Sequence, residues 1–148
     1  MSNFTSSPSY QRCQALFDRW YPDFRNAGQR YHDLVAAAVT PEPALLDLGC
    51  GRDSLAGEAI QEAHHAVGLD LSFSDLRHNQ AVTPALLADG ETIPFAPASF
   101  DVLISQWVME HIARPRRVFS EIARVLRPNG QAILFTTNAL NYVPLASR

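Results

Sequence analysis

The sequence predicts an α/β fold in which a parallel sheet carries helices on both faces. Five short apolar runs alternate along the chain with stretches whose apolar residues recur at helical spacing. Strands that are separated by helices pair in parallel. The first run, residues 44–48, breaks directly into a glycine-rich turn, and the second, residues 66–69, ends in Asp70. The ends of these two strands therefore carry the most informative residues of the chain.

Each element rests on a local pattern. Strands are expected at residues 44–48, 66–69, 85–87, 100–105 and 131–136. Helices are expected at residues 10–21, 29–39, 54–63, 72–80 and 115–126, with one helical turn at 107–112. Pro115 suits the first turn of its helix, because the N–H that proline lacks would have no partner there. Phe73 and Leu76 are expected to face inward, and residues 127–130 to form a turn.

Composition limits the classes of function. The chain has 148 residues and a net charge of −3, with no basic block that would indicate nucleic-acid binding. Arg114, Arg116 and Arg117 form its only basic cluster, which we interpret as a solvated helix start. Two cysteines, Cys13 and Cys50, indicate no disulfide framework and favour the reducing cytoplasm. No apolar stretch approaches the roughly 18 residues that a membrane span needs.

The chain divides into three expected segments. Residues 1–9 are polar, lack the apolar core of a signal peptide and are expected to be a flexible tail. Residues 10–40 are expected to hold two N-terminal helices, and residues 41–148 the domain that contains the sheet. One domain of this size is long enough to bury a core.

The glycine turn after the first strand indicates a ligand site. Gly49 and Gly51 let the backbone approach a ligand closely, and the helix expected from about residue 53 has free N–H groups at its start. Asp70 stands 19 residues after Gly51, where an acid accepts hydrogen bonds from ribose hydroxyls. A nicotinamide or flavin site usually has three glycines against a pyrophosphate. Here Ser54 takes the third position, and Asp47 favours a cationic ligand such as S-adenosylmethionine.

Four separated stretches carry a family resemblance. They are residues 45–51, residues 68–72, residues 88–95 with 99–105, and residues 125–131. In this order and spacing the chain resembles the class I S-adenosylmethionine-dependent methyltransferases, in their small-molecule branch, from about residue 31 to residue 144. The resemblance implies a Rossmann-like sheet of seven strands. The sequence ends soon after the fifth strand, so the last two strands are expected to be missing and the domain to be incomplete at its C-terminus.

The resemblance also implies a set of cofactor contacts. They are expected from Asp47, Leu48, Gly49, Cys50, Gly51, Asp70, Leu71, Asp89, Gly90 and Gln106. Asp47 would meet the methionyl ammonium, Asp70 the ribose and Asp89 the adenine amino group. Each of these residues has a structural alternative. Asp47 could be the partner of the following helix start, and Asp70 could be an N-cap. The glycines could be plain turn residues, and Asp89 and Gln106 could be solvated side chains. Cys50 is interpreted as a small buried filler, not a nucleophile.

Three further positions are informative. Asp53 replaces a third glycine of the family motif and is expected to cap the following helix. Glu110 and His111 are the only pair with catalytic character. Relatives that methylate catechol-like hydroxyls hold a metal there, but Trp107 replaces their first Glu, so no metal is expected. His111 is the candidate general base; the alternative is a histidine that orders the local helix. Tyr31, Phe95 and Trp107 are the aromatics that the resemblance places at the pocket.

Three hypotheses follow. The first is a methyltransferase that acts on a small-molecule or sugar- or lipid-type acceptor. The second is a truncated module that binds the cofactor without turnover, and co-expression with any downstream segment would separate the two. The third is a nicotinamide-dependent oxidoreductase, which NAD-induced stabilisation would reveal. In the first two cases the fifth strand would be an exposed apolar edge, where self-association or a partner chain is expected.

Overall fold

The computed structural model describes residues 8–39, 43–63 and 65–137, in two compact units, Met1–Arg30 and Tyr31–Arg148. The first unit contains α1 (Pro8–Trp20), none of whose side chains is buried, and the first turn of α2 (Ala27–Ala38). Within it the ring of Phe17 contacts Tyr21 and Phe24, each at 5.1 Å between centroids. The remainder of α2 belongs to the second unit, which holds the sheet.

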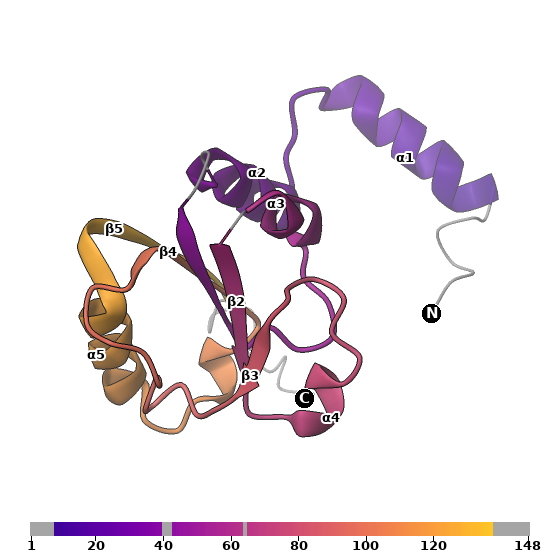
Figure 1. The fold of residues 1–148 in the computed structure, drawn as a ribbon. Helices are drawn as coiled ribbons and strands as arrows, with labels where there is room; N and C mark the ends of the chain where they lie inside the picture. Colours follow the sequence, from indigo (N-terminus) through magenta and orange to yellow (C-terminus); the bar gives the residue numbers. More distant parts are fainter. Residues whose placement is uncertain (1–7, 40–42, 64, 138–148) are drawn as a thin grey trace, which may run out of the picture. The chain divides into compact units, whose positions relative to one another are not determined.

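The sheet has five parallel strands in the described residues, in the order β3-β2-β1-β4-β5 (Figure 1). Their bounds are β1 Ala44–Leu48, β2 His65–Asp70, β3 Ala85–Leu87, β4 Phe100–Gln106 and β5 Leu126–Phe135. The strand order reverses between β1 and β4, and open sheets of this kind bind ligands at the carboxyl ends of the strands beside such a reversal. The predicted α/β fold is therefore confirmed, with Asp47 of β1 between Gly68 of β2 and Ile104 of β4.

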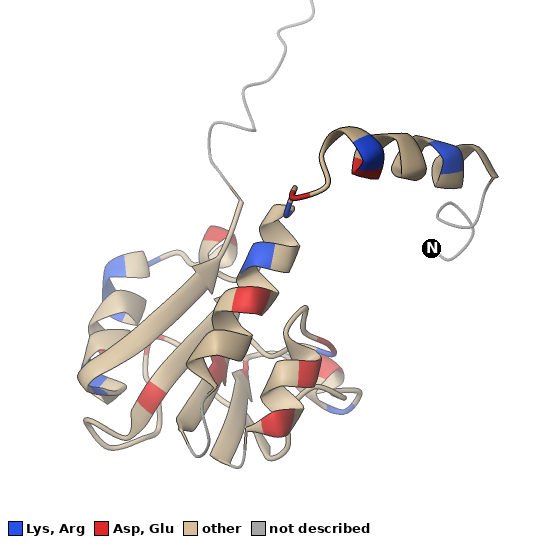
Figure 2. Ribbon diagram, turned by 90° about the horizontal axis from the view of Figure 1, so that it is seen from above, with Lys and Arg blue, Asp and Glu red and all other residues tan. Residues whose placement is uncertain are grey.

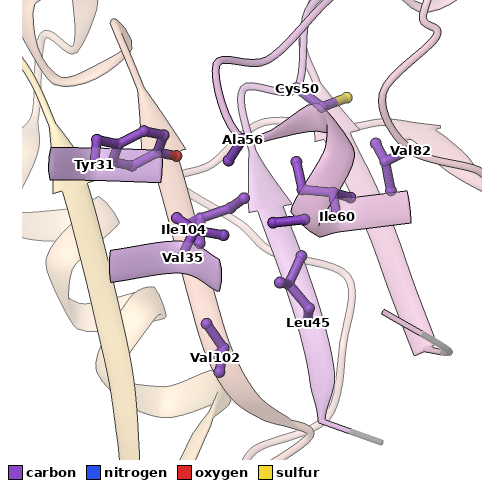
Figure 3. Close-up of a cluster of buried hydrophobic side chains, with 10 residues drawn as sticks. Tyr31, Val35, Leu45, Cys50, Ala56, Ile60, Val82, Val102 and Ile104 are labelled. Atoms are coloured by element: carbon purple, nitrogen blue, oxygen red, sulfur yellow. The ribbon is translucent and has the colours of Figure 1, made fainter. Parts of the chain in front are cut away.

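Helices cover both faces of the sheet, as predicted. On one face α2 and α3 (Gly57–Glu62) pack against β1 and β4, and Figure 3 shows Val35 and Ile60 of these helices in that cluster beside Leu45 and Ile104. On the other face α5 (Pro115–Val125) buries Val118, Ile122 and Val125 against the sheet. Neighbouring residues of β1 point to opposite faces, so each helical layer receives alternate side chains of the central strand.

Two helices are shorter than predicted. The helix expected at residues 54–63 begins only at Gly57, because the Leu55 N–H donates instead to the side-chain oxygen of Gln106 at 2.8 Å. The helix expected at residues 72–80 is α4, Phe73–Leu76. It ends before Asn79, whose side chain donates to the carbonyl oxygens of Cys50 and Gly51, at 3.1 and 2.7 Å. Hydrogen bonds to distant residues thus shorten α3 at its start and α4 at its end, relative to the predicted helices.

The helical turn expected at residues 107–112 is present as a single 3-10 turn, η1 (Met109–His111). Two smaller expectations were wrong. Phe73, expected to face inward, is 62% exposed. The turn expected at residues 127–130 lies within β5, which begins at Leu126 and pairs with β4 through an irregularity between Phe100 and Val102. The extended strand is held by the carboxylate of Asp101, which accepts from the Arg127 guanidinium at 2.6 Å and from the Ala44 N–H at 2.9 Å.

The basic cluster lies at the start of α5, and Figure 2 shows basic residues, here all arginine, gathered on this helix. Arg114, Arg116 and Arg117 are exposed, as the interpretation of a solvated helix start requires. Arg114 also pairs with Glu91 at 2.6 Å. In the described part of the chain, every helix is too short or too polar to cross a bilayer.

Candidate functional site

A cavity of about 510 Å³ opens at the carboxyl ends of β1, β2 and β4. It brings together eight of the ten residues expected to contact a cofactor: Leu48, Gly49, Gly51, Asp70, Leu71, Asp89, Gly90 and Gln106. Asp47 and Cys50 do not line its wall but lie buried directly behind it, in the strand end and the turn that the glycines belong to. The volume lies in the range of small-molecule and cofactor sites.

The glycine turn has a backbone that other residues adopt only with strain. Gly49 and Gly51 have φ of +77° and +48°. A Cβ on Gly49 would overlap the side chain of Val108, which also lines the cavity. Gly68 was missed by the sequence analysis. A Cβ on Gly68 would lie 2.7 Å from the Cys50 sulfur, so this glycine of β2 allows the turn to pack against the strand. A glycine inside a strand is the signal that predicts such a close approach.

Asp70 is oriented by two backbone donors. Its Oδ2 accepts from the Gly51 N–H at 2.8 Å and its Oδ1 from the Ser72 N–H at 2.7 Å. The N-cap of α4 is Ser72, whose hydroxyl accepts from the Asp75 N–H, so the alternative that Asp70 caps this helix is wrong. Each carboxylate oxygen has a second lone pair that can accept from a ligand hydroxyl.

Asp47 is 2% exposed, and its Oδ2 has no hydrogen-bond partner in the part of the chain that the structure describes. Burial, and to a smaller extent the negative charge of Asp70, raises the pKa of this carboxyl to about 7. A buried polar atom without a partner is costly and calls for an explanation, such as a ligand that the site is built to receive.

The loop between β3 and β4 forms one side of the cavity. Asp89 is exposed there, and its Oδ1 accepts from the Glu91 N–H at 2.9 Å. A Cβ on Gly90 would lie 3.1 Å from Leu48 Cδ1, so the loop packs closely on the end of β1. On the other side, Gln106 reaches across to accept from the Leu55 N–H.

This loop is held by two charged residues of α5. Glu121 accepts from the Ile93 N–H at 2.8 Å. Arg124 donates to the carbonyl oxygens of Phe95 and Ile93, at 2.7 and 2.8 Å, and also pairs with Glu121. Since both side chains are largely covered and pair with each other, they fix the loop that carries Asp89 against a rigid helix.

The remaining wall of the cavity is largely apolar. It includes Trp107, Val108, Ile112 and Ala113, with His111 beside them. Trp107 has φ of +58°, is 44% exposed, and packs edge-on against Phe135 at 4.6 Å. A left-handed backbone at a large aromatic residue is rare and is concentrated at functional sites.

The other residues singled out from the sequence lie away from the cavity wall. Glu110 diverges from His111, because its Oε2 accepts from the Thr136 hydroxyl at 2.8 Å. Phe95 packs edge-on against Phe100, and Tyr31 stacks on Phe135. Across residues 8–39, 43–63 and 65–137, no group of three His, Cys, Asp or Glu side chains is arranged to hold a metal ion.

Two residues of the turn have mainly structural surroundings. Cys50 is 1% exposed, as its interpretation as a buried filler requires, and burial with the charge of Asp47 raises the pKa of its thiol to about 12. Asp53 was expected to cap the following helix, and this is wrong. The N-cap of α3 is Ala56, which has no side-chain cap hydrogen bond, and the Asp53 carboxylate accepts from the adjacent Ser54 N–H.

Comparison with known proteins identifies the family. Residues 46–134 match the model of the methyltransferase domain, and this match covers more than half of the chain. The chain belongs to this family. The cofactor that the family implies is S-adenosylmethionine, and the nicotinamide hypothesis is set aside.

Individual relatives agree with the family. A biotin biosynthesis bifunctional protein of Cellvibrio japonicus is 29% identical over 86% of this chain and 26% of its own length. A malonyl-[acyl-carrier protein] O-methyltransferase of Enterobacter lignolyticus is 29% identical over 90% of this chain and 56% of its own length. Thus the chain spans between a quarter and about a half of these relatives. An S-adenosylmethionine-dependent methyltransferase of Mesorhizobium loti shares the fold, with a TM-score of 0.62 and 24% identity over 74% of this chain and 53% of that one.

Proposed function

We propose that this domain binds S-adenosylmethionine in the cavity at the ends of β1, β2 and β4 and transfers its methyl group to a small-molecule or sugar- or lipid-type acceptor. The observation that carries the proposal is the placement of Asp70. Its carboxylate stands at the end of β2, is oriented by the Gly51 and Ser72 N–H groups, and faces the cavity. A carboxylate held in this way suits the two hydroxyls of a ribose.

The charge of the site supports a cationic cofactor. Asp70, Asp89 and Glu91 line the cavity, and Asp47 lies behind the glycine turn. None of the described residues that line it is Lys or Arg. A pyrophosphate would meet these carboxylates without a compensating cation, whereas a sulfonium and an ammonium are attracted to them. The residues present therefore fit S-adenosylmethionine better than a dinucleotide.

The binding residues have distinct proposed roles. Asp70 holds the ribose, and the Asp89 carboxylate accepts from the adenine amino group. Leu48, Leu71 and Gly90 provide apolar surface for the adenine ring. The glycines let the backbone lie against the cofactor, with Gln106 on the far side. Asp47 receives the methionyl ammonium through its unpaired oxygen.

The methyl-transfer step requires few catalytic groups from the chain. The cofactor supplies an electrophilic methyl group on its sulfonium. The protein must hold an acceptor in line with the bond that breaks, and positioning of this kind is worth roughly 7–11 kcal/mol. The apolar wall of Trp107, Val108 and Ile112 is the proposed acceptor side. His111 on the same wall is the proposed base that removes a proton from the acceptor.

Methyl transfer is the direct test of this proposal. The chain is incubated with S-adenosylmethionine labelled in its methyl group and with a panel of acceptors: phenols, sugars, fatty acids and, because one relative is a malonyl-[acyl-carrier protein] O-methyltransferase, an acyl thioester with a free carboxylate. Transfer that Asp70→Ala abolishes and the exposed Glu62→Gln preserves would support the proposal. A chain that binds the cofactor but labels no acceptor, alone or with a downstream segment, would favour a binding module.

A further inference from the structure

Two buried polar atoms on one face of the sheet have no hydrogen-bond partner among the described residues. They are Asp47 Oδ2 and the Tyr31 hydroxyl oxygen, on side chains that are 2% and 3% exposed. A third such atom, Glu91 Oε2, has the Arg114 guanidinium 2.6 Å away. In the described part of the chain this leaves one acid and one phenol for which protein packing provides no hydrogen bond. Such atoms are uncommon in folded proteins.

The two side chains lie close to one another. Asp47 follows Leu45 by two residues in β1 and is the register partner of Ile104 in β4, so its side chain points to the face that these two residues share. Tyr31 of α2 covers this face, and Figure 3 shows its hydroxyl directed across Ile104 toward β1. The pKa of the Tyr31 hydroxyl is raised by burial and then by the negative charge of Asp47, as their proximity requires.

The ring of Tyr31 is held in place on its other side. It stacks on Phe135 with 5.4 Å between centroids, and Phe135 in turn contacts Trp107 of the cavity wall at 4.6 Å. Three aromatic rings therefore connect the Asp47 face to the cavity. A ring that only filled this space would need no hydroxyl, and phenylalanine would serve without burying a polar atom.

The glycine turn leaves space beside these two groups. A Cβ built on Gly51 would have Gly49 O, 4.0 Å away, as its nearest atom outside the adjacent residues, so the surroundings of this glycine are open. Gly51 also lines the cavity. A ligand that lies along the turn can thus extend its polar end past Gly51 toward Asp47 and Tyr31.

The two unpaired groups require opposite kinds of hydrogen-bond partner. The Asp47 carboxylate requires a donor, and the Tyr31 hydroxyl requires an acceptor. A ligand end that presents an ammonium and a carboxylate on the same carbon satisfies both at once. We infer that the Tyr31 hydroxyl donates to the α-carboxylate of the cofactor's amino-acid end, while Asp47 receives the α-ammonium of the same group. This inference rests on the proposed function and adds Tyr31 to the binding residues.

Calorimetry with three ligands tests the inference. S-adenosylmethionine carries both the α-ammonium and the α-carboxylate. Decarboxylated S-adenosylmethionine keeps the ammonium but lacks the carboxylate, and 5′-methylthioadenosine has neither of these two groups. For Tyr31→Phe we expect binding of S-adenosylmethionine to weaken by about 10- to 100-fold, the effect of one buried hydrogen bond to a charged group. Binding of the other two ligands should stay within about twofold. Asp47→Asn should weaken both ammonium ligands and spare 5′-methylthioadenosine.

Controls separate the possible failures. The exposed Tyr21→Phe should match the wild type for all three ligands. Tyr31→Phe should melt at or above the wild-type temperature, because it removes an unpaired buried hydroxyl. If Tyr31→Phe binds S-adenosylmethionine as the wild type does, or weakens all three ligands equally, the inference is wrong and the proposed function stands. If the wild type binds none of the three, the proposed function fails as well.

Discussion

At the scale of single residues, Gly49 is the most sensitive position of the site. Its φ of +77° and the overlap of any Cβ with Val108 leave no room for a side chain. For Gly49→Ala we expect a folded protein whose turn shifts, with cofactor binding reduced about 100-fold or more, since a misplacement of about 1 Å can cost that much. Calorimetry with S-adenosylhomocysteine checks this, and Gly57→Ala in α3, where a Cβ has ordinary contacts, is the control. Wild-type affinity in Gly49→Ala would contradict the account of the turn.

Asp47 should make stability depend on pH. The pKa of its carboxyl is raised to about 7 in the folded chain, above the value of about 4 expected for the unfolded chain. The folded state therefore binds more protons between these values, and stability falls as pH rises through this window. The ligand-free protein should lose up to roughly 4 kcal/mol of unfolding free energy between pH 4 and pH 8 through this group.

Urea unfolding measures this dependence. In Asp47→Asn the decrease between pH 4 and pH 8 should largely disappear, because the amide does not titrate. Saturating S-adenosylhomocysteine should also flatten the wild-type curve, since its ammonium favours the charged carboxylate. A wild-type curve that rises over this interval, with the same curve in the variant, would show that Asp47 is not the buried acid described.

The sequence indicated most of the site residues but not all of their surroundings. Asp47, Gly49, Gly51 and Asp70 stand in a motif whose spacing predicts a common location. The unpaired hydroxyl of Tyr31 was beyond sequence analysis, because it depends on which helix covers β1 and on the absence of a neighbouring acceptor among the described residues. Of the three aromatics expected at the pocket, the structure places only Trp107 on the cavity wall.

At the scale of elements, α5 positions the loop that carries Asp89. Arg124 holds this loop through the carbonyl oxygens of Ile93 and Phe95. For Arg124→Ala we expect weaker binding of S-adenosylhomocysteine, by about 10-fold or more, and a lower melting temperature, because the loop loses its anchor to the helix. The exposed Arg117→Ala on the same helix is the matched control. Equal affinities in the two variants would mean that the loop holds its position without α5.

The strands could be predicted more accurately than the helices. Residues 44–48 and 85–87 form β1 and β3 with the predicted bounds, because each is a short apolar run between turn residues. The start of α3 and the end of α4 instead depend on distant partners, because the Leu55 N–H donates to Gln106 and the Asn79 side chain donates to the carbonyl oxygen of Cys50. Local propensity contains no information about such distant partners.

At the scale of the whole molecule, β5 is an edge of the sheet in the described residues. An edge strand presents unpaired backbone groups that can recruit another chain. We expect this chain to self-associate with increasing concentration, and Ala132→Lys on the exposed part of β5 to reduce the association. Sedimentation velocity over a range of concentrations checks both. A wild-type chain that stays monomeric throughout would contradict this expectation.

The helices on the two faces of the sheet support different parts of the site. The side of α2 and α3 surrounds Asp47, whereas α5 on the other face supports the loop of Asp89. The cavity at the strand ends therefore depends on both helical layers, and the family match over residues 46–134 includes all of the described residues that line it.

The central claim is that this cavity binds S-adenosylmethionine through Asp70, and calorimetry with S-adenosylhomocysteine tests it most directly. We expect the wild type to bind with a stoichiometry of about one, Asp70→Ala to lose measurable binding while keeping its circular dichroism spectrum, and NAD to give no heat. Binding that survives in Asp70→Ala would contradict the assigned site, and a folded wild type that binds NAD but not S-adenosylhomocysteine would contradict the cofactor.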